Sequence, residues 1–374
     1  MVGLGFGDEG KGITTDFLAT KYPNAIVVRY CGGHQAGHTV IKGDVHHIFS
    51  SYCSGALRGA ESYISEHCCF YPPFLQREEA ILREKLVAPP ILTIHPLAKL
   101  VTPYDIAYNR LRERRLNHGS VGVGIGTTMQ RNNGPYKLHA VDIRNSSVLN
   151  AKLKQIKKYY ESELYAYNAK ELRYYSEIVE VEFKFFYHAI AVMNVQIQPY
   201  DYLRKFNHVI FEGAQGIMLD MDFGVFPNVT YGHTSSKNAI EICKSLGIRN
   251  IELYYVTRCY TTRHGNGWMP TGAPITLINN ERETNVFNEW QGDFKVGELD
   301  YNLLNYALEC DNTYSYDCDK HLVVTCLDQR PGFNVLFGPR GVSNKDLNSI
   351  IRSYSPDSKD FKQQFFYQLN QANV

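Results

Sequence analysis

The first twelve residues constrain the fold and the chemistry of this chain more than any other stretch. A short apolar run at residues 2–6 leads into the glycine-rich segment Gly-Asp-Glu-Gly-Lys-Gly at residues 7–12, and residues 13–21 have the character of a helix. A strand, a glycine-rich turn and a helix in this order direct backbone N–H groups toward phosphate oxygens. The sequence therefore predicts a P-loop-like phosphate turn at the N-terminus.

Two phosphate-binding patterns fit this turn equally well. Residues 5–11 match G-x-x-x-x-G-K of a P-loop, although Gly12 stands where Ser or Thr would hold magnesium. The glycines at positions 5, 7 and 10 match G-x-G-x-x-G of a dinucleotide fingerprint, but no acidic residue ends the apolar run at residues 25–30.

Asp8 is explained by neither pattern. A carboxylate inside a phosphate-binding turn repels its own ligand unless it binds a cation or takes a proton from the substrate. We therefore interpret residues 7–12 as a phosphate cradle that contains a reacting carboxylate.

Composition excludes several classes of protein. The 374 residues are 44% hydrophobic and 21% charged, which is ordinary for a globular chain with a large core. A net charge of +1 gives no broad footprint for nucleic acid, and the sequence has neither a signal peptide nor an apolar run that could cross a bilayer. The nine cysteines form no C-x-x-C pair, so we expect no zinc, reduced thiols and a cytoplasmic location.

Several apolar runs along the chain are each followed by a loop that bears Gly, a hydroxyl group or a charge. We expect strands, with their loops, at residues 25–30, 208–216, 251–257, 322–328 and 334–340, a hairpin at 40–49, and helices at 75–86 and 103–116. Alternate glycines predict a ligand-facing loop at residues 118–128. Residues 136–198 lack Gly and Pro, which favours a helical region at about 144–205.

These elements predict an α/β fold in which a mostly parallel central sheet is flanked by helices. No repeat or linker divides the chain, so we expect a single domain over residues 1–374. In an open parallel sheet, ligands collect at the carboxyl ends of the strands.

Taken in order, six loops resemble the adenylosuccinate synthetase family. They are Gly-Asp-Glu-Gly-Lys-Gly at 7–12, Gly-Gly-His-Gln-Ala-Gly-His-Thr at 32–39, Gly-Val-Gly-Ile-Gly at 122–126, Phe-Glu-Gly-Ala-Gln-Gly at 211–216, Tyr-Thr-Thr-Arg at 260–263 and Phe-Gly-Pro-Arg at 337–340. The resemblance implies a single-domain α/β ligase, usually a homodimer, that joins L-aspartate to C6 of IMP with GTP and Mg²⁺.

The resemblance also implies roles for individual residues. Asp8 matches the catalytic base, which takes the N1 proton of a 6-oxopurine so that O6 attacks the γ-phosphate. His38 matches the catalytic histidine that donates to the charge on O6, and Lys11 matches the lysine on the β- and γ-phosphates. Mg²⁺ is expected between the phosphates, Asp8 and the carbonyl of Gly37.

The remaining implied roles concern the two nucleotides and the amino acid. Positions expected to contact nucleotide are Glu9, Gly10, Gly12, Gln35, Gly37, Thr39, Ser120, Val121, Gln215, Thr230, Asp328 and Gly338. Lys295 and Arg263 are expected to meet the carboxylates of the amino acid. His34, His46, His47, His233 and His264 are interpreted as structural or surface residues.

Three departures from the family pattern keep other functions open. Cys326 replaces the lysine of the family's guanine motif, which leaves ATP beside GTP as the phosphate donor. The aspartate loop lacks the family's arginines and keeps only Lys295. The arginine that crosses the family's dimer interface has no clean counterpart, although Arg131 or Lys137 can be considered.

These departures favour two alternatives beside the IMP ligase, which we prefer because Asp8 is present. The first alternative is a phage-type enzyme that makes 2-aminoadenylosuccinate from dGMP with ATP. The second is a purine-nucleotide-binding protein of the same fold that has lost synthesis. No nucleic acid or membrane is expected as a partner.

Overall fold

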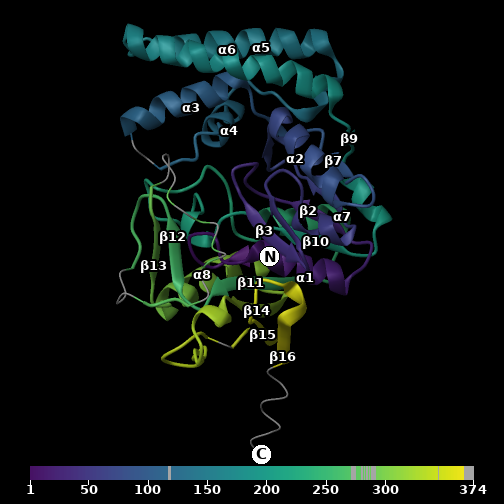
Figure 1. Ribbon diagram of the computed structural model, residues 1–374, viewed down its shortest axis with the longest axis vertical. Helices are drawn as coiled ribbons and strands as arrows, with labels where there is room; N and C mark the ends of the chain where they lie inside the picture. Colours follow the sequence, from purple (N-terminus) through teal and green to yellow (C-terminus); the bar gives the residue numbers. More distant parts are fainter. Residues whose placement is uncertain are drawn as a thin grey trace, which may run out of the picture.

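The computed structural model describes residues 1–116, 119–270, 275–278, 281, 283, 285, 287, 292–343 and 345–365. Its centre is a mostly parallel sheet built in two halves of five strands each (Figure 1). The first half has the parallel order β10 (Val209–Glu212), β2 (Ile26–Arg29), β5 (Glu61–Ile64), β7 (Leu92–Ile94), β9 (Gln196–Ile197).

The second half contains the one antiparallel pair of the central strands. Its order is β1 (Val2–Gly3), β11 (Glu252–Arg258), β14 (Asp319–Thr325), β15 (Ser349–Ser353), β16 (Phe361–Phe365), and only β15 and β16 run antiparallel. Strands such as β14 are buried along nearly their whole length because both faces of the sheet are covered.

The two halves meet at β1 and β10. The amino group of Met1 donates to the carbonyl of Phe211 at 2.7 Å, and the hydroxyl of Tyr30 donates to the carbonyl of Met1 at 2.8 Å. Val27 from one half and Val256 from the other lie in the same buried apolar cluster. The α/β fold with a mostly parallel central sheet, predicted from the sequence, is confirmed.

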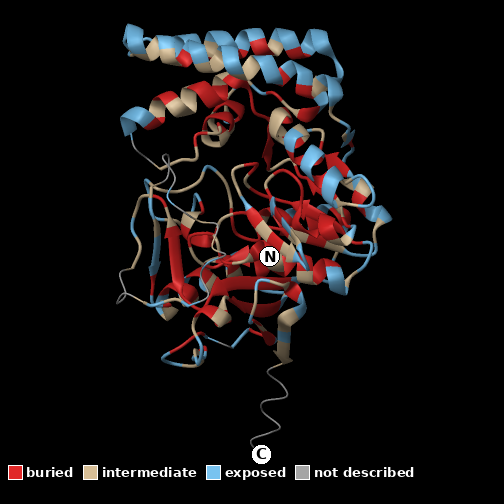
Figure 2. Cartoon of the chain, viewed as in Figure 1, coloured by how far each residue is buried: buried red, intermediate tan, exposed pale blue. Residues whose placement is uncertain are grey.

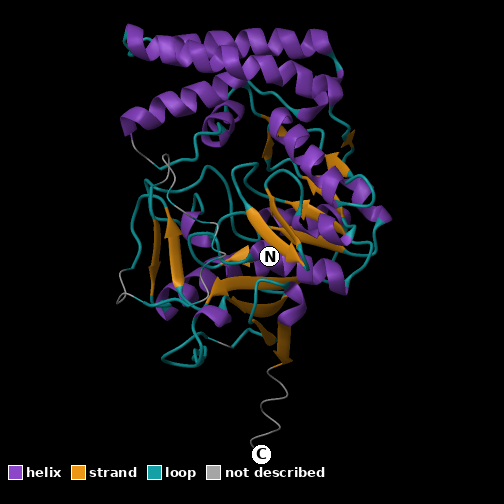
Figure 3. Ribbon diagram, viewed as in Figure 1, coloured by secondary structure: helices purple, strands orange, loops and turns teal. Residues whose placement is uncertain are grey.

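Helices cover both the sheet and its upper end. Near the sheet lie α1 (Lys11–Lys21), α7 (Lys237–Leu246) and α8 (Tyr301–Ser315). α2 (Pro72–Lys85) shares a buried cluster with β5 and β7, and farther from the sheet lie α3 (Pro103–Leu116), α4 (Ile125–Asn133), α5 (Ser146–Glu163) and α6 (Ala169–Val192) (Figures 1 and 3). The outward faces of α5 and α6 are exposed, whereas the central strands are buried (Figure 2).

Asparagine side chains begin both long helices of the region predicted to be helical. Asn145 accepts hydrogen bonds from the N–H groups of Ser147 and Val148, and Asn168 caps α6 together with Glu171. After α6 the region continues through β9 to a short 3₁₀ helix at Tyr200–Lys205. Among the described residues, no helix has both the length and the apolar character needed to span a membrane.

Three smaller pairs of strands project from the central sheet. They are the hairpin β3 (His38–Lys42) with β4 (Val45–Phe49), the parallel pair β6 (Cys69–Phe70) with β8 (Lys99–Leu100), and the hairpin β12 (Thr261–His264) with β13 (Phe294–Gly297). The hairpin predicted at 40–49 is therefore present.

Two local predictions need correction. Residues 334–340 form no strand; only an isolated bridge joins Phe337 to Val342, and the final strands are β15 and β16. The run is apolar, but Leu336 is exposed in a turn and Gly338 has a φ of 89°. The predicted loop at 118–128 ends earlier than expected, because α4 begins at Ile125 after Gly124 with φ 82°; position 118 lies outside the described residues.

A buried ion pair ties α3, α4 and α5 together. The guanidinium of Arg131 donates to both oxygens of Asp105 at 2.8 and 3.0 Å, and the hydroxyl of Tyr160 donates to the same carboxylate at 2.6 Å. The side chain of Arg131 is fully buried, so it does not reach across a dimer interface. The prediction from the sequence that Arg131 could take this role is therefore wrong. Lys137, the other candidate, is exposed.

Replacing Arg131 by Met is expected to lower the free energy of unfolding by about 3–5 kcal/mol, because it leaves the carboxylate of Asp105 buried without its cation. The same substitution at Arg173, which forms an exposed pair with Glu177, is the matched control and is expected to change it by less than about 0.5 kcal/mol. Urea unfolding followed by circular dichroism measures both, and equal effects would contradict the assignment.

Candidate functional site

The glycine-rich turn between β1 and α1 is held by three neighbouring segments through its carbonyl groups. Thr262 donates to the carbonyl of residue 7 at 3.4 Å, Arg258 to that of residue 8 at 2.5 Å, and Thr325 to that of residue 9 at 2.7 Å. These donors come from the ends of β11 and β14 and from β12. The turn is therefore fixed from the side of the second half of the sheet.

The side chain of Glu9 organises the turn from within. Its carboxylate accepts hydrogen bonds from the N–H groups of Gly5 and Gly7 at 3.0 and 2.8 Å, and from Nζ of Lys11 at 2.5 Å. Glu9 and Lys11 are both buried. Two amides and the lysine of the predicted phosphate cradle therefore share one internal carboxylate.

Asp8 adopts a left-handed backbone conformation with φ 61°, which residues other than Gly take uncommonly. Such strain persists only where the surrounding contacts impose it, and here Arg258 and the neighbouring glycines do so. Burial raises the pKa of the Asp8 carboxyl, while the charges of Arg258 and Lys11 oppose that rise. Among the described residues, none donates a hydrogen bond to this carboxylate, which lines a cavity.

Gly12 brings α1 into direct contact with β3. A Cβ at this position would lie 2.7 Å from Cβ of His38 and 3.2 Å from Oγ of Ser54. The helix and the strand therefore approach each other only because position 12 lacks a side chain. This packing explains why Gly, and not the Ser or Thr of a P-loop, follows Lys11.

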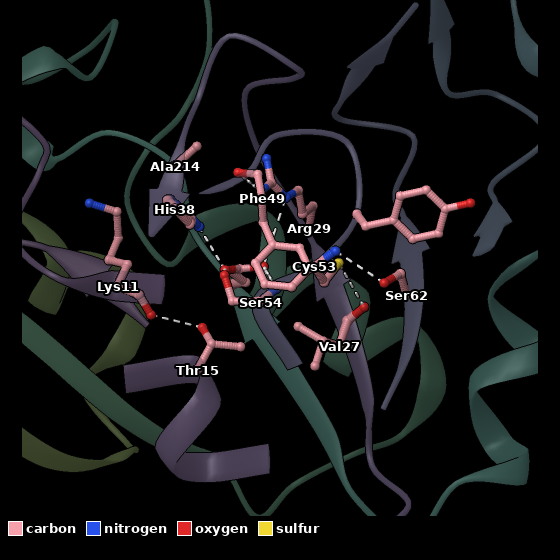
Figure 4. Close-up of polar contacts among 12 residues, drawn as sticks. Lys11, Thr15, Val27, Arg29, His38, Phe49, Cys53, Ser54, Ser62 and Ala214 are labelled. Carbon is pink, nitrogen blue, oxygen red and sulfur yellow. Dashed lines mark hydrogen bonds and ion pairs between the residues drawn. The ribbon is translucent and has the colours of Figure 1, made fainter. Parts of the chain in front are cut away.

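His38 is oriented by a buried carboxylate on β10. Nδ1 of His38 lies 2.6 Å from Oε1 of Glu212, and the carboxylate of Glu212 also accepts hydrogen bonds from the hydroxyl and the N–H of Ser54. Nε of Arg29 lies 3.8 Å from Oε2 of Glu212. In Figure 4, His38, Ser54 and Arg29 lie beside one another, with Lys11 next to His38.

The electrostatics of this group favour an ionised Glu212 and a neutral His38. Burial alone would raise the pKa of Glu212, but His38, Arg29 and the Ser54 hydroxyl stabilise its charge and bring the pKa to about 2. Burial lowers the pKa of His38, and Glu212 opposes that change. A neutral His38 that donates Nδ1–H to Glu212 keeps Nε2 as the nitrogen available to a ligand.

A cavity of about 650 Å³ opens beside the turn. It brings together most of the residues predicted to form the site: Asp8, Glu9, Gly10, Lys11, Gly12, Gln35, Gly37, His38, Thr39, Val121, Gln215 and Asp328. Gln35 and Gln215 each hold a buried side-chain oxygen with no hydrogen-bond partner among the described residues. Such unpaired oxygens are costly unless a ligand satisfies them.

Three predicted nucleotide contacts lie outside the lining of this cavity. The hydroxyl of Ser120 donates to Glu113 at 2.8 Å, and the N–H of Thr230 donates to the carbonyl of Leu219 at 2.8 Å. Gly338 lies in a turn with open space around it. Of the Ser120–Val121 step, only Val121 faces the cavity.

The two residues predicted to bind the amino acid also lie outside this lining. Arg263 donates to the carbonyls of Asn266, Trp268 and Asn228 at 2.9, 2.6 and 3.3 Å, and burial lowers its pKa to about 10. Lys295 pairs with it across the β12–β13 hairpin but is exposed. In this conformation, the guanidinium of Arg263 is hydrogen-bonded to three backbone carbonyl groups and is not free to bind a substrate carboxylate.

Several lining residues were missed from the sequence. His264, expected to be structural or on the surface, faces the cavity with a buried Nε2 that has no hydrogen-bond partner among the described residues. Arg258 faces it from the end of β11, and Ser353, Ser355 and Pro356 face it at and after the end of β15. The sequence signal for the last group was the apolar Ile-Ile pair at 350–351 followed closely by Ser-Tyr-Ser-Pro.

Replacing Gly12 by Ala tests the close contact between α1 and His38. Helix propensity alone would stabilise the protein by about 1 kcal/mol. Because the added Cβ collides with His38, we expect instead a net loss of about 1–3 kcal/mol. Gly134→Ala, where the nearest atom lies at an ordinary 3.5 Å, is the matched control. Thermal unfolding compares the two, and a stabilised Gly12→Ala protein would contradict the packing argument.

Comparison with known proteins identifies the family of the chain. A family model described as adenylosuccinate synthetase matches residues 1–335. The adenylosuccinate synthetase of Buchnera aphidicola subsp. Schizaphis graminum is 32% identical over an alignment of 290 positions that covers 72% of this chain and 64% of that protein. The one from Desulforamulus reducens is 28% identical over a match that covers 96% of this chain and 83% of that protein.

Solved structures show the same fold. Fully ligated adenylosuccinate synthetase from Plasmodium falciparum aligns with a TM-score of 0.65 and 19% identity, covering 97% of this chain and 86% of its own. Cyanophage S-2L succinoaminodeoxyadenylate synthetase, bound to dGMP and dATP, aligns with a TM-score of 0.61 and 14% identity, covering 96% and 93%.

The present chain spans just under two thirds of the length of the Buchnera protein that it matches. The family model, by contrast, covers nearly the whole of the present chain, and the chain therefore belongs to the adenylosuccinate synthetase family.

Proposed function

We propose that this chain is a C–N ligase that joins L-aspartate to C6 of a 6-oxopurine nucleotide, with IMP as the favoured acceptor and GTP as the phosphate donor. The observation that carries the proposal is the cavity shared by Asp8, Lys11 and His38. A carboxylate, an ammonium group and an oriented imidazole are the three groups that the reaction needs.

In the first step, Asp8 takes the N1 proton of the purine. O6, which gains negative charge, then attacks the γ-phosphate. This attack forms a 6-phosphoryl nucleotide and releases the nucleoside diphosphate. A purine N1–H is a far weaker acid than a carboxylic acid with its pKa near 4, so the charge on O6 needs stabilisation as it forms. His38 supplies it once its Nε2 carries a proton, since a neutral imidazole that donates Nδ1–H to Glu212 has none there, and the ionised Glu212 stabilises the imidazolium that results. The raised pKa of Asp8 makes this carboxylate a better base.

In the second step, the amino group of aspartate attacks C6. The C6–O bond breaks and inorganic phosphate leaves with the electron pair. The nitrogen of the new C–N bond loses a proton, which the leaving phosphate takes, to give the succinyl product. Lys11 lies where it can neutralise the phosphates once they replace Glu9 as its partner.

The oxygen atoms at the turn fit a magnesium ion. The carboxylate of Asp8 and the backbone at Gly37 both line the cavity, and hard oxygen donors are what Mg²⁺ prefers. When bound, the ion would neutralise phosphate charge, and these two residues would hold it.

The donor nucleotide is proposed to bind at the far side of the same cavity. Thr325, Cys326, Asp328, Ser353 and Ser355 line that side. The carboxylate of Asp328 is suited to accept hydrogen bonds from the guanine edge of GTP. The side chain of Cys326 is short and uncharged, so it cannot cover the base as a lysine would. ATP therefore remains the alternative donor.

The phage-type reaction, with dGMP and ATP, is the second candidate. The presence of Asp8 favours IMP, and the altered base motif at Cys326 favours the alternative. A nucleotide-binding protein that no longer synthesises is the third candidate. We also propose a homodimer, in which Lys137 and not Arg131 is the exposed basic residue.

Phosphate release distinguishes these candidates. The assay pairs IMP or dGMP with GTP or ATP, each with and without L-aspartate. The ligase requires an acceptor nucleotide and aspartate together. Release without aspartate, or nucleotide binding without release, would instead favour the protein that has lost synthesis.

Asp8→Asn is expected to abolish turnover while nucleotide binding persists, because an amide cannot take the N1 proton. The measurements are phosphate release and nucleotide titration by calorimetry. Asp201→Asn, at an exposed acid on the 3₁₀ helix Tyr200–Lys205, is the matched control and should retain activity. An active Asp8→Asn protein would remove the proposed base.

Glu212→Gln is expected to lower kcat at least about tenfold with little change in nucleotide affinity, because the amide no longer fixes the imidazole of His38 as a carboxylate does. Glu212→Asp should recover part of the activity. Unchanged kcat in the Gln variant would show that His38 does not depend on this carboxylate.

A further inference from the structure

The amino-acid substrate is the one ligand for which the expected residues do not line the cavity. Aspartate brings two carboxylates to a site near C6 of the purine, so it needs a cation close to Asp8. Arg263 is bonded to three carbonyls, and Lys295 is exposed outside the lining. Among the described lining residues, Lys11 and Arg258 are the only lysine or arginine.

Arg258 is built into the cavity next to Asp8. It ends β11, and its Nε donates to the carbonyl of Asp8 at 2.5 Å. Its Nη1 donates to the hydroxyl of Tyr260 at 2.7 Å, and the guanidinium lies 5.5 Å from the ring centres of both Tyr260 and Phe294. These contacts fix the plane of the guanidinium and leave one edge for a carboxylate.

That edge is taken by a carboxylate of the chain itself. Oε2 of Glu283 lies 2.6 Å from Nη1 of Arg258. Glu283 itself lies outside any helix or strand, and Glu281 and Asn285 line the same cavity. Its other oxygen accepts from the N–H and the side-chain amide of Asn285 at 3.0 and 2.8 Å.

We propose that Arg258 binds a carboxylate of the amino-acid substrate and that Glu283 occupies this position until the substrate displaces it. The inference rests on the proposed ligase function. The ligand class is a carboxylate-bearing amino acid, because a ligand without a carboxylate would leave the guanidinium buried without an anion once Glu283 is displaced. Glu283 thus holds the site closed in the absence of substrate.

A purely structural pair makes the opposite prediction. If Glu283 only neutralises Arg258, removing its charge leaves a buried cation unpaired and weakens both the fold and the site. If Glu283 competes with substrate, removing its charge favours the substrate, because a competing internal ligand reduces apparent affinity by the fraction of sites it occupies.

The test is calorimetric titration of L-aspartate into nucleotide-loaded protein, together with steady-state kinetics. Glu283→Gln is expected to lower both the Kd and the KM for aspartate by about three- to tenfold, with kcat and the nucleotide KM nearly unchanged. Glu241→Gln removes a charge from an exposed position on α7, outside the lining of the cavity, so it serves as the matched control. Arg258→Lys is expected to raise the Kd for aspartate about tenfold or more.

Separate results bear on the inference and on the ligase function. Unchanged or weaker binding in Glu283→Gln, in protein that melts like the parent, overturns the inference even where the parent ligates. Tighter binding in Glu283→Gln without turnover in any variant supports the inference and overturns the ligase. No binding of aspartate to either protein overturns the assignment of Arg258.

Discussion

The site depends on how the carbonyl groups of residues 7–9 are anchored. Thr262, Arg258 and Thr325 each take one carbonyl of the turn, and Glu9 takes two of its amides. A glycine-rich turn loses much conformational entropy on folding, so it keeps one geometry only when its backbone is bonded on both sides. With the turn held in this way, Asp8 is forced into its strained conformation and its carboxylate lines the cavity.

The two main groups of buried charged residues have different roles in this structure. Between α3, α4 and α5, the pair of Asp105 and Arg131 fixes how helices pack, outside the lining of the cavity. Under the site, Glu212 collects His38, Ser54 and Arg29 and so sets the orientation of an imidazole. Neither Asp105 nor Arg131 lines the cavity, whereas the network around Glu212 ends at His38, which does. A buried charge therefore indicates function only when its network reaches a ligand-accessible surface.

Local patterns in the sequence predicted most of the fold and the loops that carry the site. The glycine-rich turn, its carboxylate Asp8 and the hairpin at 40–49 follow from short-range signals such as glycine spacing and alternation, whereas most individual contact positions came from the resemblance to a family. Contacts between distant residues did not follow: His38 and Glu212 are 174 positions apart, and nothing local marks them as partners. The apolar run at 334–340 resembled a strand, but a strand also needs a free neighbouring edge, and β15 takes that place beside β14.

The seam between the two halves of the sheet runs directly beneath the turn. Glu212, which holds His38, belongs to the half that contains β2 and β10, whereas Arg258, Thr325 and Ser353 belong to the half that contains β11, β14 and β15. Across the seam, the Met1 hydrogen bonds and the buried cluster that contains Val27 and Val256 join the halves. Among the described residues, no strand of one half pairs with a strand of the other. The separation of the imidazole and the arginine therefore depends on how side chains pack between the halves, and the register of the strands does not set it.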